Sequence, residues 1–133
     1  MSGETDLKKL LMNMQPELHE STYVFCSVDL DTYEQLPFEP LGSFFEAEGV
    51  SLVVREEQAR DLDLAYESIW ARITLTVHSS LVAVGFLAAI TNRLAQAGIS
   101  VNPVSAYYHD HLFVPWARRS QAMDVLLDLA ERY

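Results

Sequence analysis

The sequence predicts an α+β fold, in which strands with a two-residue hydrophobic period alternate with helices that carry one apolar stripe. Residues 69–78 alternate between apolar and polar side chains and predict a strand. A helix is predicted from Gly85 to Gly98, because a glycine after the last apolar position is typical of a helix end. Residues 99–108 and 112–115 predict a strand pair, followed by a closing helix. The second half therefore reads βαββα.

The first half predicts a helix, two strands and a second helix. Apolar positions at helical spacing within residues 7–14 predict a short amphipathic helix. Residues 22–28 and 50–54 predict strands, separated by an acidic, proline-bearing loop at 29–40. A short helix is predicted over 56–62. Because each half is too small to bury much surface alone, we expect the two halves to share one core.

The boundary between the halves is predicted near Tyr66. Acidic residues precede it, but no run of glycine or serine marks a free hinge. This position divides the chain into residues 1–65 and residues 66–133. The sequence contains no repeat with a period of 20 to 50 residues, so we do not expect a solenoid.

The net charge excludes two classes of partner. The chain of 133 residues carries 19 acidic and 9 basic residues, for a net charge of −10. Phosphate backbones and anionic lipids are bound by clustered lysine and arginine, and the nearest to a cluster here is the pair Arg118 and Arg119. We therefore expect neither nucleic acid nor a membrane surface as a partner.

The cysteine content and the apolar runs predict a cytoplasmic protein. Cys26 is the only cysteine and lies in an apolar strand, so we expect a buried, inert thiol rather than a nucleophile. Residues 1–10 are polar and lack the apolar core of a signal peptide. The longest apolar run, residues 81–90, is shorter than the roughly 20 residues that span a bilayer.

Several segments resemble the ACT domain family. In the second half these are the helix head at 84–89, with the sequence VGFLAA, and the helix end at 94–100, with the sequence LAQAGIS. The serine pair at 79–80 and the segment at 105–115, SAYYHDHLFVP, resemble the ACT branch found in the cellular arginine sensors of animals and in uncharacterised bacterial proteins. In the first half, residues 44–54 resemble the ACT-like domain that precedes this branch in those bacterial proteins.

This resemblance implies two tandem ferredoxin-like units with antiparallel sheets and helices on one face. Residues 1–65 would form an N-terminal ACT-like domain and residues 66–133 a C-terminal ACT domain. A standard ACT domain closes as βαββαβ, whereas the second half stops at Tyr133 after its last helix. We expect a strand from the first half, such as residues 23–28, or a second copy of the chain to supply the sixth strand.

The resemblance also implies a ligand site between domains, at the loop after the first strand and the head of the first helix. A helix N-terminus can hold the carboxylate of an amino acid, and the carboxylate of Asp110 could pair with a ligand amine or guanidinium. The candidate ligand-binding residues are Ser79, Ser80, Leu81, Val84, Gly85, Phe86, Tyr107 and Asp110.

Each of these assignments has a plain structural alternative. Ser79 or Ser80 could simply cap a helix, because serine is a leading N-cap residue. Asp110 could be an ordinary turn residue. Tyr107 and Tyr108 point to opposite faces if their strand is regular, so only one of them, preferably Tyr107, could face a ligand.

A second polar site is possible at Glu46, Glu48 and Gly49. An exposed acidic loop explains the two glutamates equally well. The sequence leaves both interpretations open.

We expect no metal, no cofactor and no catalysis. His109 and His111 form an H-x-H pair with both rings on one face, but zinc needs three or four ligands and His19 and His78 offer no paired spacing. The sequence has no G-x-S-x-G elbow, phosphate loop or dinucleotide fingerprint. A small enzyme would need a titrating group in a cleft. The candidates are His78, His109 and His111, because the ordinary pKa of histidine lies near neutrality.

The sequence thus predicts a regulatory sensor that binds a small molecule, with an amino acid as the first candidate, and that forms a homodimer through edge strands. The dimer would cover strand edges that otherwise favour aggregation. The rival interpretation is a protein–protein interaction module that holds no ligand.

Overall fold

The first twenty residues fold with the second half of the chain and not with the residues that follow them. The computed structural model describes residues 3–132 and forms two compact units. Unit 1 combines Met1–Glu20 with Ala71–Tyr133, and unit 2 is the continuous segment Ser21–Trp70. These two units are defined by contacts, whereas the predicted boundary separates two ACT-like stretches of sequence. The boundary near Tyr66 therefore stays a prediction.

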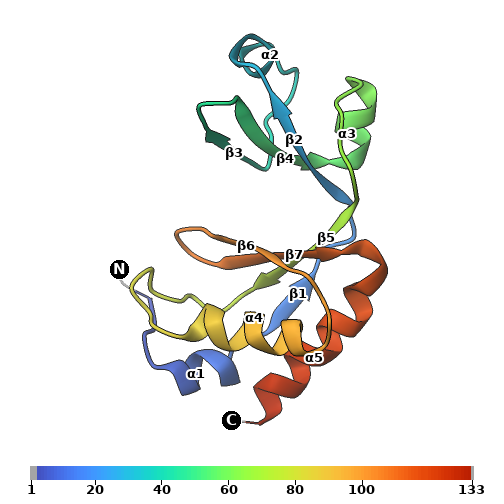
Figure 1. Cartoon of the computed structure of the whole chain (residues 1–133). Coiled ribbons are helices and arrows are strands. Elements are labelled where there is room, and N and C mark those ends of the chain that lie inside the picture. Colours follow the sequence, from blue (N-terminus) through green and yellow to red (C-terminus); the bar gives the residue numbers. More distant parts are fainter. Residues whose placement is uncertain (1–2, 133) are drawn as a thin grey trace. The chain divides into compact units, whose positions relative to one another are not determined.

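Unit 1 contains a sheet covered by helices on one face (Figure 1). Its sheet has the order β1–β5–β7–β6, with antiparallel pairing of β1 with β5 and of β6 with β7. The elements are α1 (Leu7–Met12), β1 (Pro16–Leu18), β5 (Trp70–Leu75), α4 (Phe86–Gln96), β6 (Asn102–Ser105), β7 (Asp110–Pro115), the 3₁₀ turn η1 (Trp116–Arg118) and α5 (Arg119–Glu131).

β1 supplies the strand that the second half lacks. Leu18, Glu17 and Pro16 lie opposite Ile73, Thr74 and Leu75 of β5. A strand from the first half was expected in this role, but the proposed segment 23–28 was the wrong one. The sequence could not identify β1, because three residues are too few to show a period and the segment follows directly on the predicted helix end.

The core of unit 1 lies between this sheet and its helices. The side chains of β5 alternate, so that Ala71, Ile73 and Leu75 are fully buried toward the helices. Leu10 of α1 and Leu126 of α5 are also fully buried in the same cluster. The N-terminal helix is therefore part of the core of unit 1.

Unit 2 has a smaller sheet of the order β3–β4–β2, paired antiparallel. Its elements are β2 (Tyr23–Val28), α2 (Leu30–Glu34), β3 (Gly42–Phe45), β4 (Val50–Arg55) and α3 (Glu56–Asp61). The sequence predicted no element between β2 and β4, and there it missed α2 and β3. α2 has a local cause, because the carboxylate of Asp29 accepts a hydrogen bond from the backbone N–H of Thr32, at 2.8 Å, and caps a helix of a single turn.

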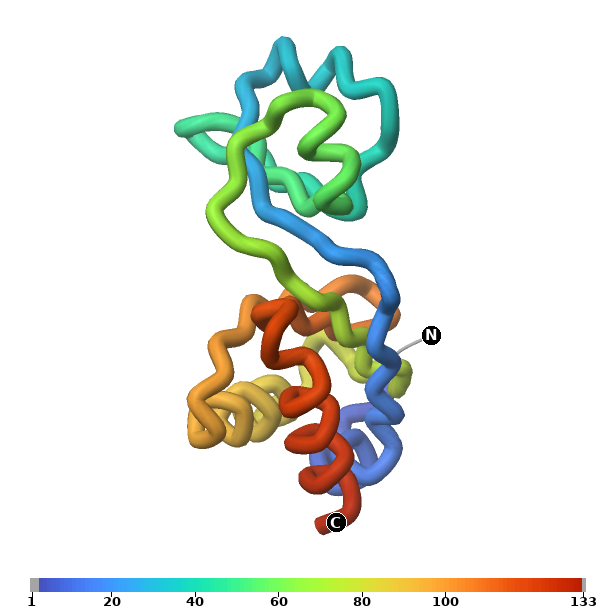
Figure 2. Tube along the Cα trace, turned by 90° about the vertical axis from the view of Figure 1, so that its right-hand side faces the viewer, coloured from blue at the N-terminus to red at the C-terminus, as the bar shows by residue number. Residues whose placement is uncertain are grey.

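The chain passes between the units twice, in two neighbouring segments. Figure 2 shows the connection from β1 to β2 beside the connection from α3 to β5. At one end the backbone N–H of His19 donates to the carbonyl of Arg72, at 3.0 Å. At the other end Tyr23 lies opposite Trp70. Unit 2 is thus inserted between two paired strands of unit 1.

The predictions for Cys26 and for the apolar segments concern burial and helix length. Cys26 is buried, and this burial raises the pKa of its thiol, so the prediction of a buried cysteine is confirmed. Within residues 3–132 no helix is long and apolar enough to cross a membrane.

We predict that Gly49→Ala destabilises the protein by about 1–3 kcal/mol. A Cβ at Gly49 would lie 2.8 Å from the carbonyl oxygen of Val28, so the backbone of β2 or of the β3–β4 turn would have to shift. Gly42→Ala is the matched control, because a Cβ there would have nothing within 4 Å. Urea unfolding should place the control within about 0.5 kcal/mol of the unsubstituted protein. Equal losses in the two variants would contradict this account.

Candidate ligand-binding site

A cavity of about 130 Å³ in unit 1 brings together most of the predicted ligand residues. Its walls are the loop between β5 and α4, the first turn of α4, and the β6–β7 hairpin. Six predicted residues line it, namely Ser79, Ser80, Leu81, Gly85, Phe86 and Asp110. Sequence analysis missed four further lining residues, Ala83, Leu87, Ala88 and Ser105.

Asp110 is a buried carboxylate held by two hydroxyl groups. Its residue is only 5% exposed. Ser79 Oγ donates to one carboxylate oxygen at 2.9 Å, and Ser105 Oγ donates to the other at 2.7 Å. Hydrogen bonds to a charged group contribute about 1.5–3 kcal/mol each, which is comparable with the several kcal/mol that burial of an ion costs. Both donors are neutral hydroxyl groups, so neither bond places a positive charge against the carboxyl group.

The β6–β7 hairpin positions Asp110 and Ser105 together. They are directly opposite each other in the strand register, and the backbone N–H of Ala106 donates to the carbonyl of His109, at 3.0 Å, to close the turn. Asp110 therefore begins β7 rather than occupying the turn itself. Ser105 could have been predicted from the sequence, because it and Asp110 lie at matching positions on either side of the polar turn.

The two serines have different roles, and α4 uses neither of them as its cap. Ser79 donates to Asp110, whereas Ser80 Oγ accepts from the backbone N–H of Val82, at 3.2 Å. Gly85 is the N-cap residue of α4 and has a φ of 87°. A residue with a side chain would be strained at this angle, so glycine is needed where the loop enters the helix. Phe86, Leu87 and Ala88 of the first turn of α4 line the cavity, and the backbone N–H groups of a first turn have no partner within their helix.

The start of the chain braces this loop from outside. The backbone N–H of Glu4 donates to the carbonyl of His78, and the N–H of Ser80 donates to the carbonyl of Glu4, both at 2.9 Å. A Cβ on Gly3 would lie 2.6 Å from the carbonyl carbon of Ser79. This close approach is possible only for glycine, and no sequence pattern predicted it.

Two predicted residues lie outside the cavity wall. Val84 is 84% exposed and Tyr107 is 59% exposed. Tyr107 and Tyr108 were expected on opposite faces of a strand, but both lie in the hairpin turn, and their ring centroids are 4.9 Å apart. The ring of His78 lies 5.5 Å from that of Tyr108. The expectation was wrong because it assumed regular strand geometry where the chain turns.

The predicted second site belongs to the β3–β4 turn of unit 2. The backbones of Glu46 and Gly49 bond to each other in both directions, and the Glu46 carboxylate accepts a hydrogen bond from Ser51 Oγ. Glu48 is exposed. The exposed acidic turn that the sequence allowed as an alternative is therefore present, and a ligand role for these residues remains a prediction.

A second polar cluster lies on the face of the unit 1 sheet that α1, α4 and α5 leave uncovered. Thr74 Oγ1 is 2.7 Å from His19 Nε2 and 2.9 Å from His111 Nδ1. Burial, followed by the charge of Arg72, lowers the pKa of His111 to about 4 and also lowers the pKa of His19. The sequence showed no partner for His19, because 55 residues separate it from Thr74.

His109 and His111 form the H-x-H pair that the sequence offered for a metal. The rings of His109 and His111 lie 6.5 Å apart between centroids. Among the residues that the structure describes, no group of three or more histidine, cysteine, aspartate or glutamate side chains could hold a metal ion.

The comparisons with known proteins agree on the fold. Two sequence models, both of the ACT domain, match the chain, one over residues 2–71 and one over residues 66–128. No curated protein matches the chain. The matches and the solved structures described below confirm the predicted fold class of two tandem ferredoxin-like units.

Three solved structures illustrate the range of similarity. A Vibrio cholerae protein of unknown function, described as a possible transport protein, is 44% identical, with a TM-score of 0.82 over 93% of this chain and 95% of that one. A protein from Agrobacterium tumefaciens is 16% identical, with a TM-score of 0.70 over 86% and 87% of the two chains. The ligand-free regulatory subunit of aspartate kinase from Thermus thermophilus is 8% identical, with a TM-score of 0.67 over 86% and 95%.

We predict that acid destabilises the protein through His111. Between about pH 6.5 and about pH 4 the unfolded chain binds a proton at this imidazole and the folded chain does not. The free energy of unfolding should therefore fall as the pH drops through this window. His111→Gln should show a smaller fall, and His78→Gln, outside this cluster, should behave like the unsubstituted protein. Thermal unfolding followed across the pH range would contradict the prediction if the His111 variant kept the original pH dependence.

Proposed function

The chain belongs to the ACT domain family, and on that premise we propose that it is a non-catalytic regulatory protein that binds a small metabolite, first of all an amino acid. Family membership supports the regulatory role, and the cavity beside α4 supports a ligand. The buried thiol of Cys26 supports a reducing compartment such as the cytoplasm.

The observation that carries this proposal is a buried carboxylate and a helix N-terminus in one small cavity. An amino acid carries an ammonium group and a carboxylate a few ångströms apart. Asp110 can accept hydrogen bonds from the ammonium group, and the free N–H groups at Phe86, Leu87 and Ala88 can donate to the carboxylate. A volume of about 130 Å³ is close to that of cavities that hold one benzene molecule. The size therefore favours a small or medium side chain.

The second candidate is an interaction module without a ligand. It is favoured by the exposed apolar side chains beside the cavity, which suit contact with another protein as well as they suit closure over a ligand. The two functions differ in one measurable property: the regulatory protein binds a ligand at Asp110, and the interaction module does not.

We predict that at least one amino acid raises the melting temperature of the protein. A ligand at about 100 times its Kd stabilises the native state by about 2.7 kcal/mol. For a chain of this size 1 kcal/mol corresponds to about 3–5 °C, so we expect a shift of about 8–14 °C. Asp110→Asn keeps the shape of the side chain but removes its charge, so the shift should be lost. Asp124→Asn removes an exposed charge from α5 and should leave the shift unchanged.

Two results would count against the ligand. One is the absence of any shift across the twenty amino acids at millimolar concentration, which would favour the interaction module. The other is a shift that persists in Asp110→Asn, which would move the site away from this cavity.

We also propose a homodimer in which the second copy covers the loop between β5 and α4. Leu81, Val82 and Val84 of this loop are 64%, 77% and 84% exposed. Unit 1 has eight acidic and seven basic residues, so two such surfaces can meet with little repulsion. The arrangement would bring Val84 and Tyr107, which lie outside the cavity wall, close to a bound ligand.

We predict that Val82→Lys combined with Val84→Lys shifts the protein from dimer to monomer in sedimentation velocity experiments. Burial of two lysine ammonium groups in an apolar contact is unfavourable by several kcal/mol. Leu127→Lys on the exposed face of α5 is the control and should leave the sedimentation coefficient unchanged. A monomer in the unsubstituted protein, or a dimer in both variants, would refute this interface.

A further inference from the structure

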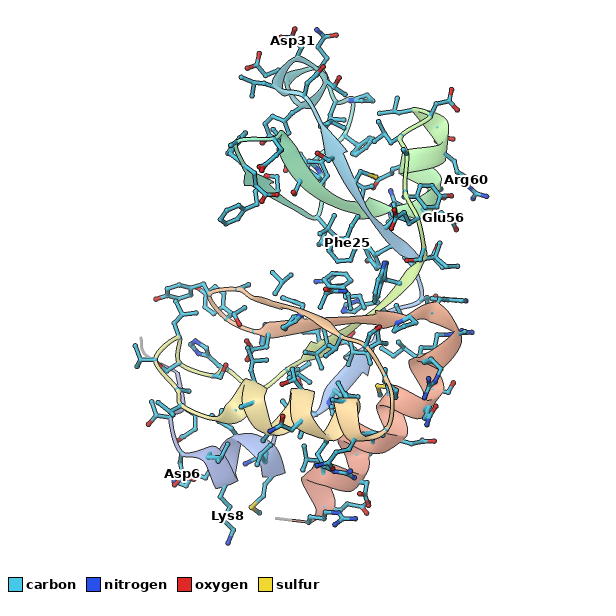
Figure 3. The ribbon with its side chains drawn as sticks, viewed as in Figure 1. Asp6, Lys8, Phe25, Asp31, Glu56 and Arg60 are labelled. Carbon is cyan, nitrogen blue, oxygen red and sulfur yellow. The ribbon has the colours of Figure 1, made fainter. Side chains whose placement is uncertain are left out.

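The net charge of the chain is concentrated in unit 2. Residues 21–70 contain eleven acidic and two basic residues, which leaves nine of the ten net negative charges in this segment. The two basic residues are Arg55, the last residue of β4, and Arg60 of α3. Figure 3 labels Arg60, and it also labels Asp31 of α2. Arg55 is paired with Glu57. The basic residues thus lie outside α2 and β3.

β3 is the outer strand of this acidic sheet, and its outer edge has hydrogen-bonding groups to offer. β3 pairs with β4 in the sheet order. Glu46 and Gly49 exchange both backbone hydrogen bonds, which marks them as a hydrogen-bonded pair of the antiparallel ladder. Because such pairs alternate with non-bonded ones, the N–H and C=O groups of Ser43 and Phe45 point away from β4. They form a template for one more strand.

The outer strand of unit 1 differs in this respect. Ala106 bonds to His109 across the hairpin, so the same alternation turns the backbone groups of Pro103 and Ser105 outward from β6. Proline has no N–H to donate, and its presence on an edge strand blocks further pairing. β6 is protected in this way, and β3 has no proline within its bounds.

Two aromatic side chains are exposed on the unprotected strand. Phe44 is 73% exposed and Phe45 is 61% exposed, and strand alternation places them on opposite faces of the sheet. The ring of Phe45 lies 5.2 Å from that of Tyr33 in an edge-to-face arrangement. An added strand would therefore find an aromatic contact on each face.

A cavity of about 450 Å³ lies beside β3, on the same side as Tyr33. It is lined by apolar and aromatic side chains, with Glu34 and Glu39 supplying carboxylates. A lysine or arginine side chain fits this combination, because its stem packs on apolar surface while its charged end pairs with a carboxylate. The side chains that an added strand directs toward this cavity would thus be basic.

We propose that the outer edge of β3 binds an extended, basic segment of a partner protein, which adds a strand to the sheet of unit 2. Main-chain hydrogen bonds to Ser43 and Phe45 supply a sequence-independent part of the affinity. The cavity beside Tyr33 selects a long basic side chain, and the charge of unit 2 accelerates association. This surface does not depend on the ligand cavity of unit 1.

Charge argues against a second copy of this chain as the occupant. Two β3 edges brought together would place two segments of net charge −9 against each other. A basic segment neutralises the same charges. The strand edge alone would accept either occupant, and the charge decides between them.

The test uses two ten-residue peptides, one of alternating valine and arginine and one of alternating valine and glutamate. Binding to the full chain is measured by fluorescence anisotropy, and the bound surface is located by shifts of backbone amide NMR signals. The arginine peptide should bind, shift the amides of Ser43 and Phe45, and bind at least tenfold more weakly when salt is raised by 0.2 M. The glutamate peptide should not bind.

Matched variants separate the strand edge from the charge. Ser43→Pro copies the protection that Pro103 provides on β6 and should weaken binding at least tenfold. Glu34→Gln with Glu39→Gln should weaken it severalfold, whereas Asp61→Asn with Glu67→Gln removes the same charge elsewhere in unit 2 and should have a much smaller effect. The melting temperature of each variant reports whether it is folded, and the amide shifts in the unsubstituted chain test the site without any variant.

Four outcomes would overturn the proposal. The first is no binding of the arginine peptide, the second is equal binding of the two peptides, and the third is a set of amide shifts confined to other strands. The fourth is self-association of the chain that Ser43→Pro abolishes, which would assign the edge to a second copy.

Discussion

The antiparallel pairing of β1 with β5 is the interaction on which the rest of the structure depends. It joins residues almost sixty positions apart, brings α1 under the sheet, and closes the core of unit 1. It also holds the start of the chain where Glu4 can bond to His78 and Ser80. Unit 1 therefore cannot be completed until the chain has passed through all of unit 2, whereas unit 2 consists of neighbouring segments that can pair early.

The candidate site illustrates how a polar group is kept in an apolar core. Asp110 begins a strand whose next inward-facing residues, Leu112 and Val114, are fully buried. Hydroxyl groups from the β5–α4 loop and from β6 fix both of its oxygens. Neutral donors thus satisfy both buried oxygens without an opposite charge beside them.

Periodic segments were predictable, and short or irregular ones were not. α4 and α5 follow from apolar residues at helical spacing, and β2 and β4 follow from apolar runs of strand length. β1 and α2 span three and five residues, so their structure is decided by a pairing and by a cap that no period reveals. At the site, the serine loop and Asp110 could be predicted because they carry a family pattern. Ser105, Gly3 and the contact of His19 with Thr74 depend on tertiary approach.

Unit 2 is an insertion in the sequence of unit 1, because the chain passes between the units twice. The chain enters and leaves it through two neighbouring segments, which are held together by the backbone hydrogen bond from His19 to Arg72 and by the pairing of Tyr23 with Trp70. Its two ends therefore lie side by side, as they do where one domain has been inserted into a loop of another. Exchange of the whole segment 21–70 for a tight turn would keep every element of unit 1 in sequence order. A cut at residue 65, in contrast, would remove α1 and β1 from the core that they complete. The units defined by packing are thus nested in the sequence, whereas the two ACT matches follow one another.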